Sequence, residues 1–561
     1  MNSFSLGLIL AASQTEPTAP AASFVTAPGV ASLEIARAGD RERLIVIGAD
    51  GRVAVVPLAI AEESSDGAEQ VVFGEAELVG PTLPNPERCL FTFAPATEGA
   101  DADLWFTDPR GFHRFQSTEA GFAAESERIL RRADFDLLTG MPRSAPLLRD
   151  IDGDGRPDLS LPGLDAVGLY WNRTEDPASV VFESGGAIGV RTSLGNEFED
   201  SDLSFRVRSS LVVPQLELED LNGDGQADLI VQEPTRVAYH LGNPESGFGE
   251  EADVVLDLTL FRDNETRRSS LNAGGALELA ADATVERRDL NGDGLPDYVV
   301  FQGRKLWTFL GRPTGPQFSE PSTVLKSAEP ITVVVFFDLD ADERPELVLL
   351  RLEIPTLPSL FLGLFSEFDV PVHAGAYRAL ENGKFEARPF RSRQLRLRLP
   401  PILSVIRDPY ALLQKFRGAT KRFRDTQSAD LDGDGQDELL LLSEARDRLD
   451  IYPGRGTQTQ VLGQAEIEAL LREQLFESEG DVWDTDRLIG LVGDVAAKQV
   501  RSKTEGQAPV ATIHMDLRKG RSLRDLYVPD ANGDGAAELI LAYRSPMHPG
   551  ALRLDLHRVR F

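Results

Sequence analysis

The chain has 561 residues, 42% of them hydrophobic and 26% charged, and this composition is typical of a folded protein and excludes extensive disorder. A formal net charge of −32 and an isoelectric point near 4.6 exclude nucleic acid as a partner, because phosphate binding requires an excess of Lys and Arg. The single cysteine, Cys89, excludes a disulfide framework and a thiolate metal cluster, and we expect it to be a small buried residue.

The chain begins with a short apolar run, FSLGLILAA at residues 4–12, followed by a segment rich in Pro, Ala and Thr. This run resembles the core of a secretory signal, although no Lys or Arg precedes Arg37 to supply a basic n-region. We therefore expect residues 1–23 to be a signal peptide or linker, and the protein to be secreted, periplasmic or at the cell surface. No apolar run reaches the roughly 18 residues of a membrane-spanning helix, so we expect no transmembrane segment.

Internal repeats dominate the rest of the chain. Two strand-rich units come first, at residues 33–59 and 89–116. Six units with an acidic, glycine-rich loop follow: DIDGDGRPDLSL (150–161), DLNGDGQADLIV (220–231), DLNGDGLPDYVV (289–300), DLDADERPELVL (338–349), DLDGDGQDELLL (430–441) and DANGDGAAELIL (530–541).

The segments around the loops recur as well. A short apolar run precedes each loop, a β-rich run follows it, and then comes a second strand-like segment such as AVGLYWN (166–172) or KLWTFLGR (305–312). A fourth short segment often follows. Four short strands per unit predict an all-β fold, a closed β-propeller of four-stranded blades with eight blades, or alternatively seven. The last unit lacks one strand, which we expect residues 23–26 to supply.

The uneven repeat spacing predicts insertions in the propeller domain (residues 24–561) at about 353–372, 400–425 and 460–520. Residues 408–418 and 465–476 read as small helices. The apolar stretch at 353–372 is either an exposed partner-binding patch or a plug on one face, and the second alternative is slightly favoured. A basic cluster either contacts an acidic partner or offsets nearby loops: Lys415, Arg417, Lys421, Arg422 and Arg424.

The loop pattern is that of an oxygen-rich metal site. Carboxylate or amide side chains at positions 1, 3, 5 and 9, with a carbonyl at position 7, provide the ligands that calcium prefers, and Gly at position 6 permits a left-handed turn. An EF-hand would need Glu at position 12 and a following helix, but position 12 is apolar in all six copies. Asp and Gly also form metal-free turns, yet six copies with the same spacing of side chains within the loop favour calcium.

The repeated D-x-[DN]-x-D-G-x-x-[DE]-L loop with β-rich flanks resembles the FG-GAP/VCBS repeat of integrin-α-type β-propellers. The resemblance implies about five Ca²⁺ ions in hairpins within the blades. Together with the position-7 carbonyl, the implied ligands are Asp150, Asp152, Asp154, Arg156 and Asp158; Asp220, Asn222, Asp224, Gln226 and Asp228; Asp289, Asn291, Asp293, Leu295 and Asp297; Asp430, Asp432, Asp434, Gln436 and Glu438; and Asp530, Asn532, Asp534, Ala536 and Glu538.

The copy at 338–349 departs from this pattern. It has Ala341-Asp342-Glu343 where the others have Gly-Asp-Gly, and Glu in the left-handed position costs on the order of 1 kcal/mol. We expect weak or no calcium binding in this sixth set: Asp338, Asp340, Asp342 and Glu346.

Motifs of catalysis are missing from the sequence: the six histidines show no zinc spacing, and neither a GxSxG elbow nor a nucleotide-binding loop occurs. We therefore expect a calcium-binding, extracytoplasmic, adhesion-like module, monomeric, that binds a protein or a carbohydrate. The alternative is a propeller-fold enzyme acting on polysaccharide, similar to a lyase, which would need a cluster of polar residues on one face.

Overall fold

The computed structural model describes residues 22–559 with gaps, the longest at residues 62–69, 74–79, 132–138, 262–282, 354–363, 402–425, 455–468 and 488–507. The described residues are mostly β-strand, and the chain divides into two compact units. The first comprises residues 1–80, 420–462 and 496–561, and the second residues 81–419 and 463–495. The described helices are single turns, η1 (Pro86–Arg88), η2 (Leu258–Phe261) and the π-helical η3 (Glu473–Glu477), and none is long and apolar enough to cross a membrane.

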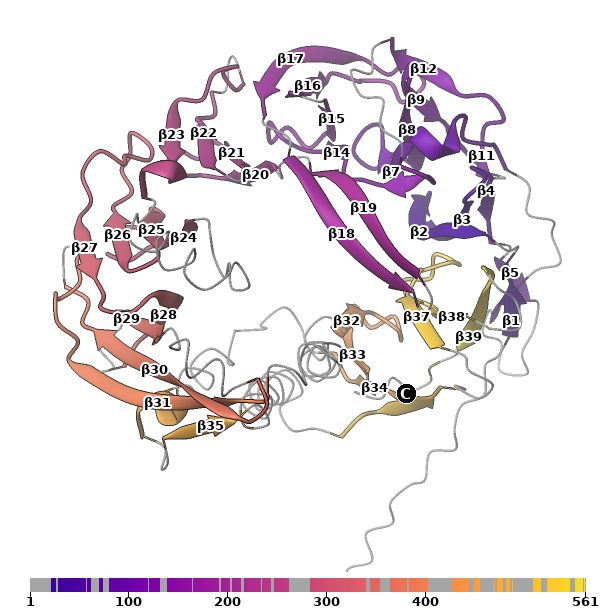
Figure 1. The fold of residues 1–561 in the computed structure, drawn as a ribbon. Helices are drawn as coiled ribbons and strands as arrows, with labels where there is room; N and C mark the ends of the chain where they lie inside the picture. The colour runs from indigo at the N-terminus through magenta and orange to yellow at the C-terminus, as the bar shows by residue number, and fades with distance from the viewer. Residues whose placement is uncertain are drawn as a thin grey trace, which may run out of the picture. The chain divides into compact units, whose positions relative to one another are not determined.

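The second unit contains three four-stranded antiparallel sheets, each a meander in chain order (Figure 1). Their strands are β14 (Leu148–Arg149), β15 (Asp158–Pro162), β16 (Ala166–Asn172) and β17 (Phe182–Gly189); β20 (Leu216–Glu219), β21 (Asp228–Gln232), β22 (Arg236–His240) and β23 (Val254–Asp257); and β24 (Thr284–Arg288), β25 (Asp297–Gln302), β26 (Lys305–Phe309) and β27 (Thr323–Lys326). Alternate residues of each strand point to opposite faces, so both faces of a central strand can carry apolar side chains.

Two five-stranded sheets complete the core of this unit. Their strands are β7 (Leu90–Pro95), β8 (Ala102–Asp108), β9 (Gly111–Phe115), β12 (Glu127–Leu130) and β13 (Arg143–Ser144); and β28 (Ile331–Phe337), β29 (Glu346–Leu352), β30 (Phe368–Tyr377), β31 (Arg391–Leu399) and β35 (Val482–Asp484). Two separate hairpins are β10 (Ser117–Thr118) with β11 (Gly121–Phe122), and β18 (Ser193–Ser201) with β19 (Ser204–Val212).

The first unit contains three larger sheets and a hairpin. Their strands are β2 (Val30–Ala38), β3 (Arg41–Gly48) and β4 (Val53–Val55); β32 (Thr426–Ala429), β33 (Glu438–Leu442), β34 (Arg448–Tyr452) and β36 (Ala511–His514); β37 (Ser522–Tyr527), β38 (Leu539–Arg544), β39 (Leu552–His557) and β1 (Ala22–Val25); and the hairpin of β5 (Leu58–Ala61) with β6 (Gln70–Phe73). The described residues thus form eight sheets of three or more strands, one for each repeat found in the sequence.

The N-terminal strand β1 completes the last sheet. It pairs antiparallel with β39, from Ala22 opposite Leu556 to Val25 opposite Arg553. The Ser23 hydroxyl also donates a 2.6 Å hydrogen bond to Asp555. This confirms the prediction that the segment at residues 23–26 supplies the missing strand, and it joins the two ends of the described chain without a covalent link.

Successive sheets within each unit pack face to face. Ile230 and Tyr239 of the β20–β23 sheet, for example, share a buried cluster with Tyr298 and Phe309 of the β24–β27 sheet. Similar clusters join the other consecutive pairs of sheets within each unit. Burial of a large apolar side chain contributes about 1.5–3 kcal/mol, so these clusters are the main source of stability and hold neighbouring sheets in order.

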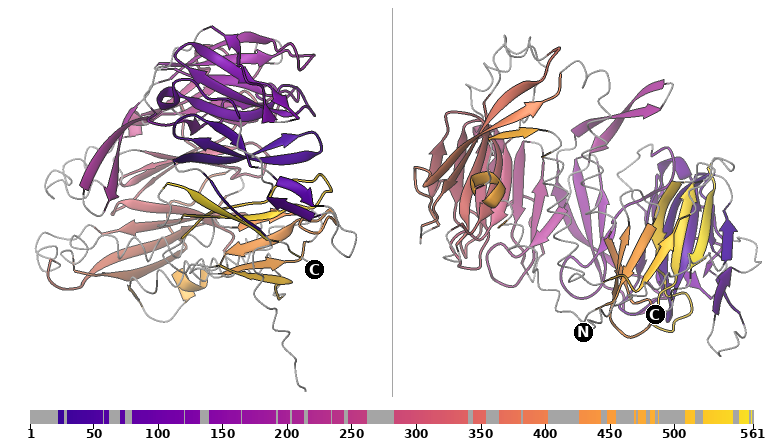
Figure 2. Two further views of the ribbon diagram at one scale, coloured as in Figure 1. Left: turned by 90° about the vertical axis from the view of Figure 1, so that its right-hand side faces the viewer. Right: turned by 90° about the horizontal axis from the view of Figure 1, so that it is seen from below.

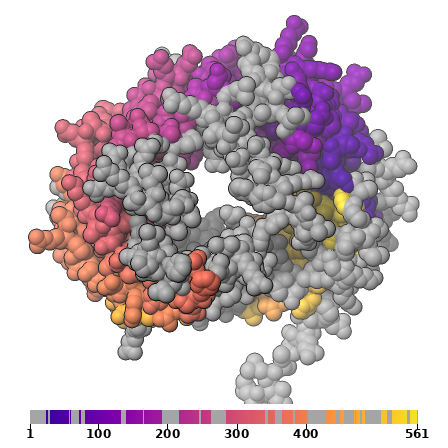
Figure 3. Space-filling view, in the orientation of Figure 1, coloured from indigo at the N-terminus to yellow at the C-terminus, as the bar shows by residue number. Residues whose placement is uncertain are grey.

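The predicted insertions are only partly described. The helix predicted at 408–418 and the basic cluster with it lie outside the described residues. Of the helix predicted at 465–476, the described end is helical, and its Leu475 is buried against the β28–β31 sheet. The apolar stretch at 353–372 leads into β30, and Phe365 before that strand is 74% exposed. The orange hairpin of β30 and β31 extends past the neighbouring strands in Figure 2 and lies at the surface in Figure 3.

Candidate metal centre

The six acidic loops occupy one position in the fold: each connects the first strand of a sheet to the second. They lie between β14 and β15, β20 and β21, β24 and β25, β28 and β29, β32 and β33, and β37 and β38. Position 12 of every loop therefore lies in a strand, as predicted, and a helix of the EF-hand kind is absent after each of these described hairpins. The repeated location places the position-1 and position-9 side chains at equivalent ends of six sheets.

The position-1 aspartate organises each loop from within. In the first loop, Asp150 Oδ1 accepts a hydrogen bond from the Gly153 amide at 2.7 Å, and its Oδ2 accepts one from the Gly155 amide at 3.0 Å. Gly155 has φ +82°, the left-handed conformation predicted for position 6. The same pair of bonds recurs at Asp220, Asp289, Asp430 and Asp530. A tight turn therefore exists in five loops before any ion is considered.

Positions 3, 5 and 7 form a relay in which each side chain accepts from the backbone two residues ahead. Asp152 Oδ1 accepts from the Asp154 amide at 3.2 Å, and Asp154 Oδ1 accepts from the Arg156 amide at 2.9 Å. The other four loops repeat this relay, and there the donors at position 7 are the backbone amides of Gln226, Leu295, Gln436 and Ala536. Each carboxylate of the relay keeps its second oxygen, Oδ2, outside the relay.

The position-9 carboxylate is buried and fastens the loop to the sheet. Asp158 Oδ2 accepts hydrogen bonds from the Ile151 and Asp152 amides at 2.9 and 3.2 Å, and its Oδ1 accepts one from the Asn172 amide at 2.8 Å, at the end of the next strand. The equivalent bonds at Asp228, Asp297 and Glu438 come from Gly242, Gly311 and Gly454. One side chain therefore connects the start of the loop, its own strand and the end of the following strand.

Burial raises the pKa of these position-9 carboxyl groups. The pKa of Asp158 and of Asp297 is raised to about 6, and that of Glu538 to about 7, because desolvation disfavours the charged form. Backbone hydrogen bonds lower the pKa in part, and the neighbouring loop carboxylates raise it further. A cation beside these groups would relieve the repulsion, so the loops are electrostatically suited to bind one.

The residue whose backbone amide donates to the position-9 carboxylate, at or just after the end of the following strand, was not recognised from the sequence. It is glycine in three sheets, where an added Cβ would lie 2.4 Å from the Ala227 carbonyl (at Gly242) or 2.6 Å from the Pro296 carbonyl (at Gly311). In the first loop Asn172 takes this place, and its Nδ2 donates to the equivalent carbonyl, that of Pro157, at 3.1 Å. The signal was present in the sequence, since the segments LGN (241–243), LGR (310–312) and PGR (453–455) each have a glycine shortly after the strand that follows the loop strand.

The carboxylates converge most closely in two loops. Oxygens of Asp150, Asp152 and Asp158 lie within 4.8 Å of one another, as do those of the equivalent residues Asp430, Asp432 and Glu438. In the loops at 220, 289 and 530, position 3 is Asn, and its Nδ2 donates to the position-5 carboxylate at 2.7–2.9 Å.

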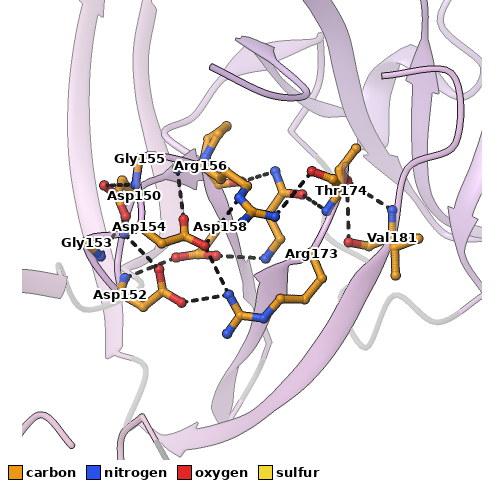
Figure 4. A network of polar contacts seen from close by, with 12 residues as sticks. Asp150, Asp152, Gly153, Asp154, Gly155, Arg156, Asp158, Arg173, Thr174 and Val181 are labelled. Atoms are coloured by element: carbon orange, nitrogen blue, oxygen red, sulfur yellow. Dashed lines mark hydrogen bonds and ion pairs between the residues drawn. The ribbon is translucent and has the colours of Figure 1, made fainter. Parts of the chain in front are cut away.

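An arginine outside the loop pattern meets the first loop. The guanidinium of Arg173, the residue after β16, lies 3.0 Å from Asp152 Oδ2 and 3.2 Å from Asp154 Oδ2 (Figure 4). A cationic group therefore already occupies the side of the loop where the two free oxygens point. Nothing in the loop sequence identified this residue, since the two strands β15 and β16 separate it from the loop.

The sixth loop is described only in part. Asp340 and Asp342 lie outside the described residues, as does Glu343, and the prediction of weak binding, which came from Glu at the position where the other loops have a left-handed glycine, is not tested. Glu346 retains the position-9 bond, accepting from the Leu339 amide at 2.7 Å. The connection of the loop to its sheet is therefore kept even where the glycines are lost.

The donor set fits calcium. All side-chain donors in the five loops are carboxylate or amide oxygens, without nitrogen or sulfur ligands, and hard divalent cations such as Ca²⁺ prefer such donors. The guanidinium beside Asp152 and Asp154 shows that a positive charge is accommodated there.

Comparison with known proteins identifies one repeat. Residues 289–349 match the FG-GAP-like repeat, which confirms the resemblance inferred from the loops. None of the curated proteins matches the chain in sequence.

Several solved structures are similar over much of the chain. An Agrocybe aegerita lectin that recognises non-reducing terminal N-acetylglucosamine is 18% identical, with 68% of this chain and 82% of that chain covered, at a TM-score of 0.27. The V. cholerae biofilm matrix protein Bap1 is 11% identical, with 84% of this chain and 66% of that chain covered, at a TM-score of 0.21. The Photorhabdus luminescens Tc holotoxin pore is 13% identical, covering 94% of this chain but 25% of that one, at 0.21.

Proposed function

Because the chain carries an FG-GAP-like repeat at residues 289–349, we propose that its sheets are the blades of a calcium-stabilised β-propeller that acts as an extracytoplasmic binding module. Eight sheets among the described residues and face-to-face packing of consecutive sheets support the propeller. Closed architectures of this kind leave few exposed strand edges, and the pairing of β1 with β39 is of the type that joins the first and last blades.

The observation that carries the calcium proposal is the loop geometry repeated in five hairpins. In each, positions 1, 3, 5 and 9 are held by backbone amides so that their oxygens gather on one turn. When bound, Ca²⁺ supplies positive charge that offsets the repulsion among these carboxylates. The residues of the chain preorganise the oxygens, and the position-9 side chain transmits the stiffening of the loop to the sheet.

Calorimetric titration tests this proposal. Protein freed of metal with a chelator is titrated with Ca²⁺, and its melting temperature is measured with and without the ion. Binding of four to six ions with a marked rise in melting temperature is expected, since binding to the folded state alone stabilises it by mass action. Affinities of 10⁻⁴–10⁻³ M would be those of extracellular modules. Absence of binding would reduce the loops to turns.

The binding surface is proposed at the insertions, and its ligand is a protein or a carbohydrate. Phe365, 74% exposed within the apolar stretch at 353–372, is the described side chain that best supports this view, because contiguous exposed apolar patches commonly mark interfaces. Calcium-dependent retention on immobilised polysaccharides and candidate proteins tests it. Phe365→Ser should weaken retention, whereas the control Leu260→Ser, an equally exposed side chain (79%) far along the chain from the insertions, should not.

A further inference from the structure

An arginine side chain faces the carboxylates of the first loop. Asp152 and Asp154 each give one oxygen to the backbone relay, and the remaining oxygen of each, Oδ2, contacts Nη1 of Arg173 at 3.0 and 3.2 Å. Those two oxygens are donors of the proposed calcium site. The network in Figure 4 shows the guanidinium directed at both of them. Arg173 and a calcium ion would therefore compete for the same atoms.

A second arginine strengthens this arrangement. Arg156 Nε lies 3.4 Å from Asp154 Oδ2, and its Nη1 donates to the Thr174 carbonyl at 3.3 Å. This bond holds the segment that carries Arg173 against the loop. The side chain of Arg173 is nevertheless 38% exposed, so it can leave the loop for solvent without breaking the buried core.

Within the part of the chain that the structure describes, the equivalent positions beside the second and third loops do not repeat the contact. The residue after the glycine whose amide donates to the position-9 carboxylate is Asn243 beside the second loop and Arg312 beside the third. Among the described residues, Arg312 makes no ion pair with the carboxylates of its loop. The loop at 430 also has four carboxylates, with Glu438 at position 9, and Arg455 stands at the place that corresponds to Arg173 but lies outside the described residues.

We propose that Arg173 is a built-in competitor for the cation of the first loop and sets that loop to bind calcium more weakly than its four carboxylates alone would. The inference rests on the proposed calcium binding and deepens it. Calcium must displace the guanidinium of Arg173 before it can bind Asp152 and Asp154, and this displacement breaks two ion-pair contacts. The positive charges of the ion and the guanidinium also repel each other at short range.

The experiment compares calcium affinities at the first loop. Wild type, Arg173→Gln, Arg173→Lys and the control Arg312→Gln are titrated calorimetrically after chelator treatment. Asp150→Ala removes the first-loop site, so the binding heat that this variant lacks relative to wild type is the heat of calcium binding at the first loop. Removal of two partly exposed ion-pair contacts predicts about ten-fold tighter binding at this site in Arg173→Gln. Arg173→Lys should stay near wild type, and Arg312→Gln should leave all sites unchanged.

The outcomes separate the two proposals. A gain in Arg173→Gln that disappears when Asp150→Ala is added, as in a double-mutant cycle, supports the competitor role. Calcium binding with an unchanged or weaker first-loop affinity in Arg173→Gln overturns this inference alone. No calcium binding to any of the proteins overturns the proposed function, and the inference falls with it.

Discussion

Replacement of Gly311 by alanine should loosen the β24–β27 sheet. The Gly311 amide donates a 2.7 Å hydrogen bond to Asp297 Oδ1, and its Cα lies against the Pro296 carbonyl, from which an added Cβ would be 2.6 Å distant. Ordinary contact begins at 3.4 Å, so the backbone must move by about 0.8 Å. A shift of that size stretches the hydrogen bond to about 3.5 Å, where little of it remains.

The cost follows from these two effects. Overpacking against rigid backbone costs about 1–3 kcal/mol, and loss of a hydrogen bond to a charged group costs about 1.5–3 kcal/mol. Because one displacement causes both, the contributions overlap, and we expect a total loss of about 2–4 kcal/mol. The effect should appear with and without calcium, since the clash involves backbone atoms and not the ion.

Native-state hydrogen exchange of peptides covering β24–β27 measures this loss locally, which suits a chain of two units better than one global melting curve. Gly189→Ala is the matched control: an added Cβ meets nothing within 4 Å there, so exchange should stay the same or slow slightly. If Gly311→Ala leaves exchange in β24–β27 at the wild-type rate, the argument that close approach requires glycine at this position is refuted.

Two further predictions concern buried charge in other sheets. Asp103→Ala should destabilise the β7–β9 sheet by about 3–5 kcal/mol, because it leaves Arg114, paired at 2.6 Å and 2% exposed, with only the exposed Glu127 carboxylate at 3.8 Å; the double variant Asp103→Leu/Arg114→Met should recover much of the loss in urea denaturation. Burial lowers the pKa of His557 to about 4. The unfolded chain then binds more protons between pH 6.5 and 4, so stability is fully present above pH 6.5 and falls as the pH decreases, by about 2 kcal/mol at pH 5. The stability difference between wild type and His557→Phe should shift by that amount between pH 7.5 and pH 5, and a pH-independent difference would contradict the assignment.

The sequence by itself determined the features that depend on local spacing. A turn of nine residues closes through bonds between neighbours such as Asp150 and Gly155, so its conformation, its left-handed glycine and the strand that follows were predictable from the repeat. The apolar runs on either side predicted the strands for the same reason. The missing strand at residues 23–26 was predictable because one repeat lacked a member that the others had.

Only the tertiary structure decided the features that join residues far apart in the chain. The position-9 carboxylate meets the amide of Asn172 or Gly311 because strand register brings the end of one strand over the start of another. Arg173 faces Asp152 and Asp154 for the same reason, although nothing in the loop itself encodes it. Local backbone preferences act over a few residues, whereas pairing and packing select partners by distance in space, and the balance of charge at each loop arises from that second kind of contact.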